Sequence, residues 1–269
     1  MWTLLFYVAC TPSDESKPSD STPEPPPERV VLHEVFSGSN CGPCAPAADN
    51  IAAALADHSG RYALVKYQIG SDPYITKEAV DRRMFYLPDE ETYGIPFVHA
   101  DGFGFHPNNM DGNETPYGSD HFLAFAEDPT ILGITLDAEV TDQTVLISIE
   151  LKTWEDLSAE NLRLMISINE KTTYQNVGSN EQTEFHHVLK KFVPDDLGTL
   201  LPPLIAGETS EYEFSYTFAG DYDDEAGFGS MVNHSTAHTV EEFDDLEVLV
   251  WVQDMDTWEV YNSAWTGHE

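Results

Sequence analysis

The sequence predicts an α/β domain followed by an all-β antiparallel sandwich domain. Residues 30–128 alternate apolar strand-like runs with helix-like runs, a pattern typical of a sheet with some parallel strands. Residues 129–269 contain seven runs in which apolar and polar residues alternate between turn signals, a pattern typical of two packed antiparallel sheets. At 269 residues the chain is long enough for both domains.

The predicted elements follow the chain in that order. In the first domain we expect strands at 30–36 and 62–69, a short strand after Pro96, and helices at 43–58, 76–86 and 117–127. In the second domain we expect strands at 131–140, 144–151, 162–169, 185–192, 211–218, 246–253 and 259–265.

Cys41 and Cys44 form a C-G-P-C motif between the first predicted strand and the first predicted helix. Free backbone N–H groups and the dipole at a helix start stabilise a thiolate, which is the species that attacks a disulfide. Cys41 is then the nucleophile and Cys44 the resolving thiol, while Pro43 fits an early helical position that needs no backbone donor. The alternatives are a zinc site, for which further Cys or His ligands at suitable spacing are missing, and a structural disulfide, which would constrain little in so short a loop.

The strand, C-G-P-C, helix, second strand and G-I-P-F-V at residues 94–98 together resemble the thioredoxin-like fold. The resemblance implies a cis bond between Ile95 and Pro96, next to the dithiol, where an X-Pro bond adopts cis at modest cost. It also implies a substrate-binding role for Ile95, Gly42 and Pro43. By itself, Pro96 would equally fit the edge of a strand.

Two positions depart from the thioredoxin pattern. Asn40 stands where thioredoxins have a Trp before the first cysteine. The buried acid that assists proton transfer to the resolving thiol has an approximate counterpart in Glu34, which matches only with a one-residue insertion. We therefore weigh two roles for Glu34: a desolvated carboxyl with a raised pKa that transfers protons, or an ordinary strand-edge carboxylate.

The first 29 residues predict export and tethering. Residues 1–9 are apolar and end at Cys10, which resembles the end of a bacterial lipoprotein signal with Cys10 as the lipidated residue. The alternative is a frayed apolar tail. Residues 11–29 contain no large apolar residue and are rich in Pro, Ser and acids, so we expect a disordered tether. The expected organisation is a signal remnant at 1–10, a tether at 11–29, and domains at 30–128 and 129–269.

Charge and missing motifs exclude several function classes. The chain has 12 Lys and Arg against 48 Asp and Glu, a net charge of −36, which argues against nucleic-acid partners and against direct contact with anionic lipid. Only a lipid anchor would hold it to a membrane. The Asp-rich loops lack the spacing of a calcium loop, and no phosphate-binding loop or catalytic triad is evident. We expect no metal and no cofactor.

Three segments are similar to the bacterial 28-kilodalton outer-membrane-protein family: E-V-F-S-G-S-N-C-G-P-C, E-F-H-H-V-L-K-K-F and L-V-W-V-Q-D-M-D-T-W-E-V-Y-N-S-A. The resemblance implies an outer-membrane lipoprotein with the predicted domain pair. Together these observations predict an exported thiol–disulfide oxidoreductase that acts on disulfide-containing proteins with an unidentified thiol redox partner. The alternatives are a surface adhesin whose first domain is purely structural, and a disulfide isomerase or oxidase.

Overall fold

The computed structural model describes residues 25–87, 94–105, 116–227 and 229–267. The predicted signal remnant with Cys10, and residues 11–24 of the predicted tether, lie outside the described residues. Among the helices that the structure does describe, none has the length and apolar character needed to cross a membrane.

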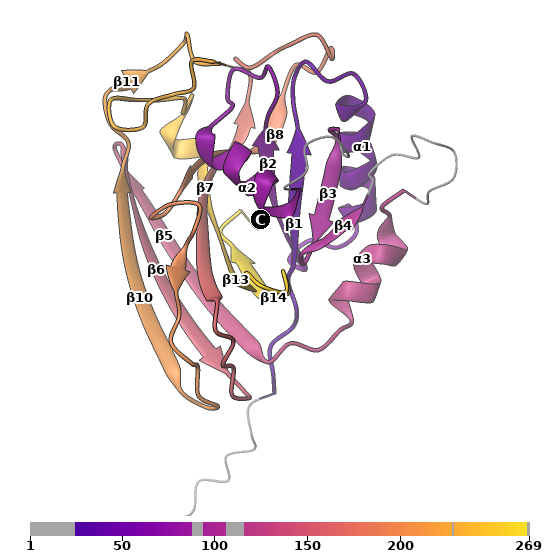
Figure 1. Ribbon diagram of the computed structural model, residues 1–269, viewed down its shortest axis with the longest axis vertical. Helices are drawn as coiled ribbons and strands as arrows, with labels where there is room; N and C mark the ends of the chain where they lie inside the picture. Colours follow the sequence, from indigo (N-terminus) through magenta and orange to yellow (C-terminus); the bar gives the residue numbers. More distant parts are fainter. Residues whose placement is uncertain (1–24, 88–93, 106–115, 228, 268–269) are drawn as a thin grey trace, which may run out of the picture.

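The centre of the molecule is a mixed sheet of nine strands (Figure 1). Its order is β14 (Val260–Trp265), β13 (Leu246–Asp254), β7 (Leu162–Thr173), β8 (Phe185–Phe192), β2 (Tyr62–Gln68), β1 (Val31–Ser37), β3 (Phe97–Ala100) and β4 (Phe103–Phe105), with β9 (Thr199–Leu200) beside β7. The pairs β1–β2 and β2–β8 are parallel, and the other pairs are antiparallel.

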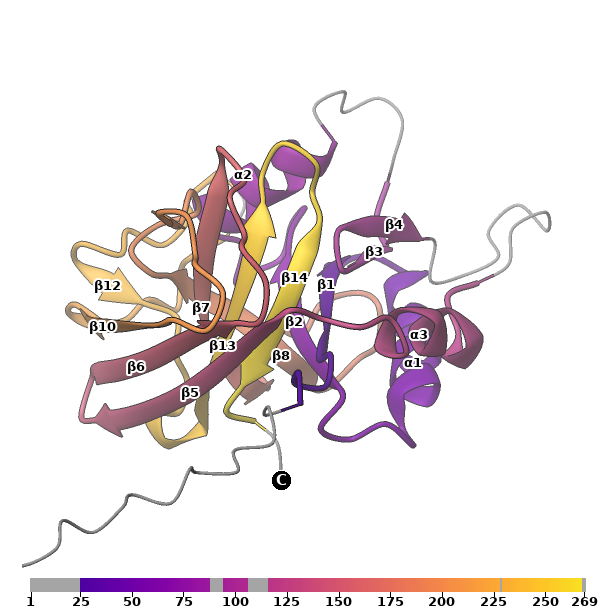
Figure 2. The ribbon, with the colours of Figure 1, turned by 90° about the horizontal axis from the view of Figure 1, so that it is seen from below.

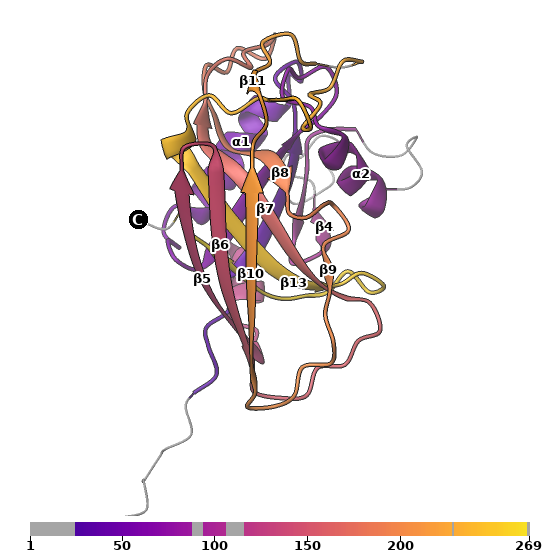
Figure 3. The same cartoon turned by 90° about the vertical axis from the view of Figure 1, so that its left-hand side faces the viewer.

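Helices pack on the part of this sheet that contains β1 and β2, and a smaller sheet packs on the part that contains β7 and β13. Helices α1 (Cys44–Leu55) and α3 (Ser119–Ala126) pack on β1, and α2 (Lys77–Tyr86) packs on the other face (Figure 2). A three-stranded antiparallel sheet of β5 (Leu132–Thr141), β6 (Thr144–Thr153) and β10 (Thr209–Thr217) covers β7 and β13 (Figure 3). Strands β11 (Asp221–Tyr222) and β12 (Ala237–His238) and a short 3₁₀ helix (Phe243–Asp245) complete the described elements.

The predicted fold class is wrong. The described residues are 42% strand and 15% helix, with three α-helices, so the chain is mostly β and not a helix-rich α/β thioredoxin-like domain joined to a sandwich. The nine-stranded sheet also takes strands from both sides of residue 128. The individual strands and helices lie close to their predicted positions, and the error concerns how they assemble.

The physical reason lies in strands that are buried on both faces. Strands β5, β6 and β10 alternate between more and less buried residues, as a half-exposed sheet requires. All nine residues of β13 are buried, and β7 is buried over most of its length. Continuous apolar runs such as L-V-W-V are typical of strands between two layers. In the structure, alternate residues of β7 and β13 belong to two different cores, so these strands are shared between the layer of β5, β6 and β10 and the layer that contains α2.

The large sheet curls so that its distant strands share one core. Phe36 of β1 and Tyr67 of β2 belong to the same buried cluster as Trp251 of β13 and Val260 of β14. On the outer face of β1, α1 and α3 form a separate cluster that includes Val35 and Ile51. Successive residues of β1 therefore point into different cores, which fixes where each site residue on that strand can reach.

Hydrogen bonds join the start of the described chain to its last strand. Arg29 forms an ion pair with Asp101 at 2.9 Å and donates to the carbonyl oxygen of Val260 at 3.0 Å. The backbone amide of Val30 donates to Oδ1 of Asn262 at 2.9 Å. The segment that leads into β1 is therefore fixed to β14 before the first strand begins.

Candidate functional site

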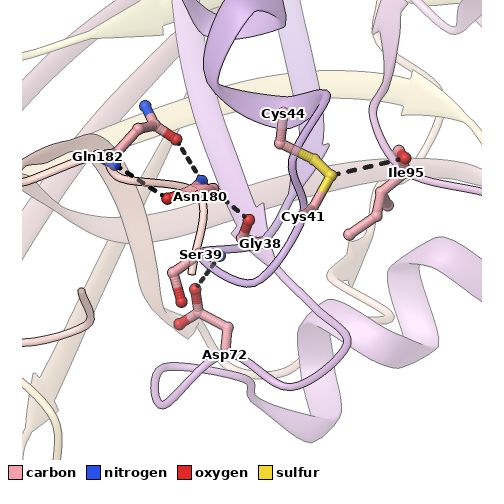
Figure 4. Close-up of a disulfide and its surroundings, with 8 residues drawn as sticks. All are labelled: Gly38, Ser39, Cys41, Cys44, Asp72, Ile95, Asn180 and Gln182. Carbon is pink, nitrogen blue, oxygen red and sulfur yellow. Dashed lines mark hydrogen bonds between the residues drawn. A yellow bond between two sulfur atoms is a disulfide. The ribbon is translucent and has the colours of Figure 1, made fainter. Parts of the chain in front are cut away.

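Cys41 and Cys44 form a disulfide at the start of α1 (Figure 4). The backbone amide of Cys44 donates to the carbonyl oxygen of Cys41 at 3.1 Å, which starts the first turn of the helix. Pro43 occupies the helix N-cap position and offers no side-chain cap. Cys44 is 1% exposed and Cys41 is half-buried, so an incoming sulfur would reach Cys41 first.

The bond between Ile95 and Pro96 is cis, as the sequence predicts. It places the carbonyl oxygen of Ile95 3.7 Å from Sγ of Cys41. A pocket of about 440 Å³ lies here, lined by Cys41, Ile95, Gly42, Pro43 and Ile69 among others. The structure therefore brings together five of the predicted residues, Cys41, Cys44, Gly42, Pro43 and Ile95, at the end of β1, where Pro96 joins them through its peptide bond.

A buried carboxylate supports the loop that leads to Cys41. Oδ2 of Asp72 accepts a hydrogen bond from the backbone amide of Ser39 at 2.8 Å, and its Oδ1 accepts one from the backbone amide of Tyr74 at 2.8 Å. Asp72 is fully buried, and burial raises its pKa while these two amides oppose the rise. The sequence S-D-P-Y offers a signal for the Asx-type turn at Asp72, but not for its reach to Ser39.

A segment from the second half of the chain holds the same loop from the other side. The backbone amide of Asn180 donates to the carbonyl oxygen of Ser39 at 2.9 Å, and its side-chain amide donates to the carbonyl oxygen of Gly38 at 3.3 Å (Figure 4). Oδ1 of Asn40 accepts from the backbone amide of Ser179 at 3.1 Å. This connection between β7 and β8 is part of the site, and the sequence carries no local signal for it.

Glu34 lies on the face of β1 that packs against α2. Phe36, two residues further along β1, lies in the core shared with α2, whereas Val35 faces α1. The Glu34 side chain is 0% exposed and forms a bidentate ion pair with Arg82, at 2.6 Å to Nε and 2.9 Å to Nη2. The hydroxyls of Tyr67 and Tyr86 also donate to it, at 2.7 Å and 2.5 Å.

The pKa of Glu34 is not raised, whereas the proton-transfer alternative would require a rise. Burial acts to raise this pKa, but the Arg82 guanidinium and the hydrogen bonds outweigh it, so the pKa is lowered. The carboxylate stays ionised and is committed to a buried pair between β1 and α2. It is also no edge carboxylate, because β1 lies inside the sheet. These contacts favour a structural role for Glu34, and its part in proton transfer stays a prediction.

Within the described residues no group of three or more His, Cys, Asp or Glu side chains could hold a metal ion. The chemical features that the structure does show at this site are the two sulfurs, the half-buried position of Cys41 and the helix start beside it.

Comparisons with known proteins identify similar folds. No protein-family model matches the chain, and no curated protein matches it significantly. The solved structure of HBP35 of Porphyromonas gingivalis is similar with a TM-score of 0.61 at 13% identity, over 88% of this chain and 74% of that one. A protein from Agrobacterium tumefaciens is similar with a TM-score of 0.52 at 12% identity, over 89% of this chain and 95% of that one.

A domain of the outer membrane lipoprotein Omp28 from Porphyromonas gingivalis also matches, at 18% identity, over 51% of this chain and 86% of that domain. Its TM-score of 0.31 is too low to carry an argument, so membership of the 28-kilodalton family stays a prediction. The comparisons show that this chain shares its overall fold with HBP35 and with the Agrobacterium protein.

Proposed function

We propose that the protein is a thiol–disulfide oxidoreductase whose reacting pair is Cys41 and Cys44. The observation that carries the proposal is the geometry at the start of α1. One sulfur is buried, the other is half-buried and borders a pocket, and the two form a disulfide. A helix start stabilises the thiolate that forms when the pair is reduced.

In the reduced protein the Cys41 thiolate attacks one sulfur of a substrate disulfide. A bond forms between Cys41 Sγ and that sulfur, the substrate disulfide breaks, and the second substrate sulfur leaves as a thiolate that takes a proton from water. The Cys44 thiolate then attacks Cys41 Sγ, which closes the Cys41–Cys44 disulfide and releases the first substrate sulfur. Two electrons pass to the substrate, and an external dithiol of a redox partner returns the pair to its reduced state.

The pocket beside Cys41 suits an extended segment of a protein substrate. It is lined by Gly42, Pro43 and Ile95, and the Ile95 carbonyl is free to accept a hydrogen bond from a substrate amide when Cys41 is the attacking thiolate. A thiolate has no proton to donate to that carbonyl. Backbone recognition of this kind accepts many sequences, so we propose disulfide-containing proteins as the substrate class.

We further propose that the protein works in the bacterial cell envelope, as an outer-membrane lipoprotein anchored through Cys10. The apolar run that ends at Cys10 and the tether after it support this location. An exported compartment is also where a disulfide persists. Replacing Cys10 with Ala should move the protein from the membrane fraction to the soluble fraction. Continued membrane association of that variant would argue against the anchor.

Trapping tests the redox chemistry in a chain that carries Cys10→Ser, so that only two thiols remain. In this background, Cys44→Ser should accumulate mixed disulfides with partner proteins, because the resolving thiol is gone. The matched control is Cys41→Ser, which keeps one buried thiol and should trap nothing. Equal trapping by both variants, or none by either, would sink the proposal. The reduction potential then assigns direction: about −270 mV indicates a reductant and about −120 mV an oxidant.

A further inference from the structure

A cavity of about 430 Å³ lies where β2 and β8 separate beneath α1. These two parallel strands share one register pair, Lys66 with Val188. Towards the beginnings of both strands, β2 and β8 share no further register pair. Residues of β2, of α1 and of the segment that enters β8 line the space between them. Its volume lies within the range of sites that enclose small ligands.

Lys66 lies at this cavity with its charge unpaired. The side chain is 6% exposed, and among the described residues its ammonium makes no hydrogen bond and no ion pair. The two other buried lysines of the described chain behave differently. Lys190 pairs with Glu170 at 3.0 Å and donates to the carbonyl oxygen of Thr239 at 2.6 Å. Lys191 pairs with Glu78. Lys66 is thus the exception among the buried lysines of the described chain.

The ammonium reaches the accessible space of the cavity, but a largely buried charge without a partner among the described residues still loses part of its hydration, which costs folding free energy. Burial lowers the pKa of Lys66 to about 8, against the opposing attraction of the Asp49 and Asp72 carboxylates. Neither carboxylate contacts the ammonium, so three donor hydrogens remain available at the cavity. An anionic group of a ligand would supply the missing acceptor.

The remaining lining restricts the ligand further. Buried apolar side chains form the wall, among them Ile51, Leu55 and Leu64. Three exposed acidic residues, Asp49, Glu181 and Glu184, lie at the rim of the cavity, together with polar residues of the segment that enters β8. A ligand that fits has one carboxylate at Lys66 and an apolar body along the wall. A second negative charge would meet the acidic rim.

His187 gives independent support for a built site. It lines the same cavity with φ at 60°, a left-handed backbone conformation that is rare for a residue with a side chain. Its Nδ1 is hydrogen-bonded to the buried carboxylate of Glu247 at 2.8 Å, which fixes the ring. Strained backbone that is held by a buried partner clusters at binding and catalytic sites.

We propose that this cavity binds a small organic monocarboxylate with an apolar body, and that Nζ of Lys66 holds the carboxylate. The site uses neither sulfur, so this inference does not depend on the proposed redox function. A variant with both cysteines replaced by Ser should bind the ligand as the unaltered protein does.

The first test uses octanoate as the probe and calorimetry at pH 7 with the full chain. We expect saturable binding of one octanoate per chain. Lys66→Met keeps the length of the side chain but removes the charge, and should weaken binding at least tenfold, as expected for loss of a charged hydrogen bond. Lys171→Met, at a lysine outside the cavity lining, should bind as the unaltered protein does. Unchanged affinity in Lys66→Met would overturn the proposal.

Two further experiments test the charge of the ligand against the acidic residues at the edge of the cavity, and the space available for its apolar body. Octan-1-ol lacks the carboxylate and suberate carries a second one, so each should bind at least tenfold more weakly than octanoate. Ala52→Trp fills the cavity while Lys66 stays in place, and should weaken octanoate binding. Its control is Ala53→Trp, at an exposed neighbour on α1 that does not line the cavity. Suberate binding as tight as octanoate binding, or no difference between the two Trp variants, would contradict the site.

Discussion

The backbone amide of Asn180 donates a hydrogen bond to the carbonyl oxygen of Ser39, two residues before the first cysteine of the C-G-P-C motif. The neighbouring bond, from the Asn180 side chain to Gly38, joins residues 142 positions apart. The loop that carries Cys41 is therefore held both by its own half of the chain, through Asp72, and by the connection between β7 and β8. Four predictions follow from this arrangement and from the two buried charges described above.

Gly178→Ala should destabilise the protein. A Cβ at this position would lie 2.5 Å from the carbonyl oxygen and 2.6 Å from the carbonyl carbon of Ser39, so the two segments must move apart. Such overpacking costs about 1–3 kcal/mol of the free energy of unfolding. Urea denaturation measures it. Gly227→Ala is the control, because its added Cβ meets no atom within 4 Å and should leave the midpoint unchanged.

Asn180→Ala should make the Cys41–Cys44 disulfide easier to reduce. The substitution removes the side-chain bond to Gly38, so the loop before Cys41 is less restrained and the two thiols meet less often. We expect the reduction potential to rise by about 10–30 mV, where about 30 mV corresponds to a tenfold change in the equilibrium constant. Equilibration with glutathione buffers measures this. Asn161→Ala, whose side chain bonds to Asp256 instead, should not shift the potential. An identical shift of the reduction potential in both variants would refute the proposed effect of the Asn180–Gly38 hydrogen bond on the disulfide.

Glu34→Gln should lower stability and leave thiol chemistry alone. The change leaves Arg82 buried without its charge partner, which costs about 3–5 kcal/mol. Because the pKa of Glu34 is lowered in the folded protein, the stability that its charge provides is present above the unfolded pKa of 4.5. This stability is lost as pH falls through the lower, folded pKa. Thermal unfolding should show a smaller difference between the two proteins at pH 3 than at pH 7.

The alkylation rate of Cys41 in the reduced protein separates the two roles of Glu34. A structural Glu34 predicts the same pH profile of this rate in the Gln variant, whereas a proton-transfer group predicts a shifted profile. Glu155→Gln, an exposed acid on the β6–β7 connection, should alter neither stability nor rate.

Lys66→Met should stabilise the protein at pH 7 in the absence of any ligand. The pKa of Lys66 falls from 10.5 to about 8 on folding, so the unfolded chain binds more protons between these values and the stability of the unaltered protein rises with pH across that window. Below pH 8 the buried charge costs up to about 3 kcal/mol, which the Met variant recovers. Calorimetric unfolding at pH 7 and pH 10 should show the two proteins converging.

Charged and titratable groups also surround Lys66, and the comparison at two pH values must account for them. They are Asp49, Tyr62, Asp72, Glu181, Glu184, His186 and His187. Lys171→Met provides the matched control and should show no rise in stability. A Lys66→Met variant less stable than the unaltered protein at pH 7 would mean that the ammonium has a partner.

Local patterns in the sequence predicted what is local in the structure. The C-G-P-C motif before a helix and most strand positions follow from short stretches and their spacing, whereas the Ile95–Pro96 cis bond is implied by the resemblance to the thioredoxin-like fold. The pairing of Glu34 with Arg82 joins residues 48 positions apart, and the role of Asn180 joins more distant ones still. Neither contact produces a periodic pattern in the sequence, because a buried polar residue in a strand or loop cannot be told from an exposed one until its partner is known.

The fold class shows the same limit on a larger scale. Alternation of apolar and polar residues identifies a strand with one solvent-exposed face, and β5, β6 and β10 show this alternation. Alternation gives no information about which two layers enclose a strand such as β13. The burial of β13 on both faces fits a sandwich core and a shared sheet equally well. Lys66 fits the polar half of such an alternation, yet it is buried, since α1 covers that face of β2.

The hydrogen bond between Val30 and Asn262 joins the start of the described chain to β14, so this contact forms only after β14 has been synthesised. The first described strand shares its core with β13 and β14, and Val30 and Arg29 bond to residues of β14. A nascent chain emerging from the ribosome cannot close this core until its last strand has been made. The core that β1 shares with β13 and β14 therefore closes only once β14 is available, whereas Cys41 and Cys44 lie three residues apart and can be joined independently of that step.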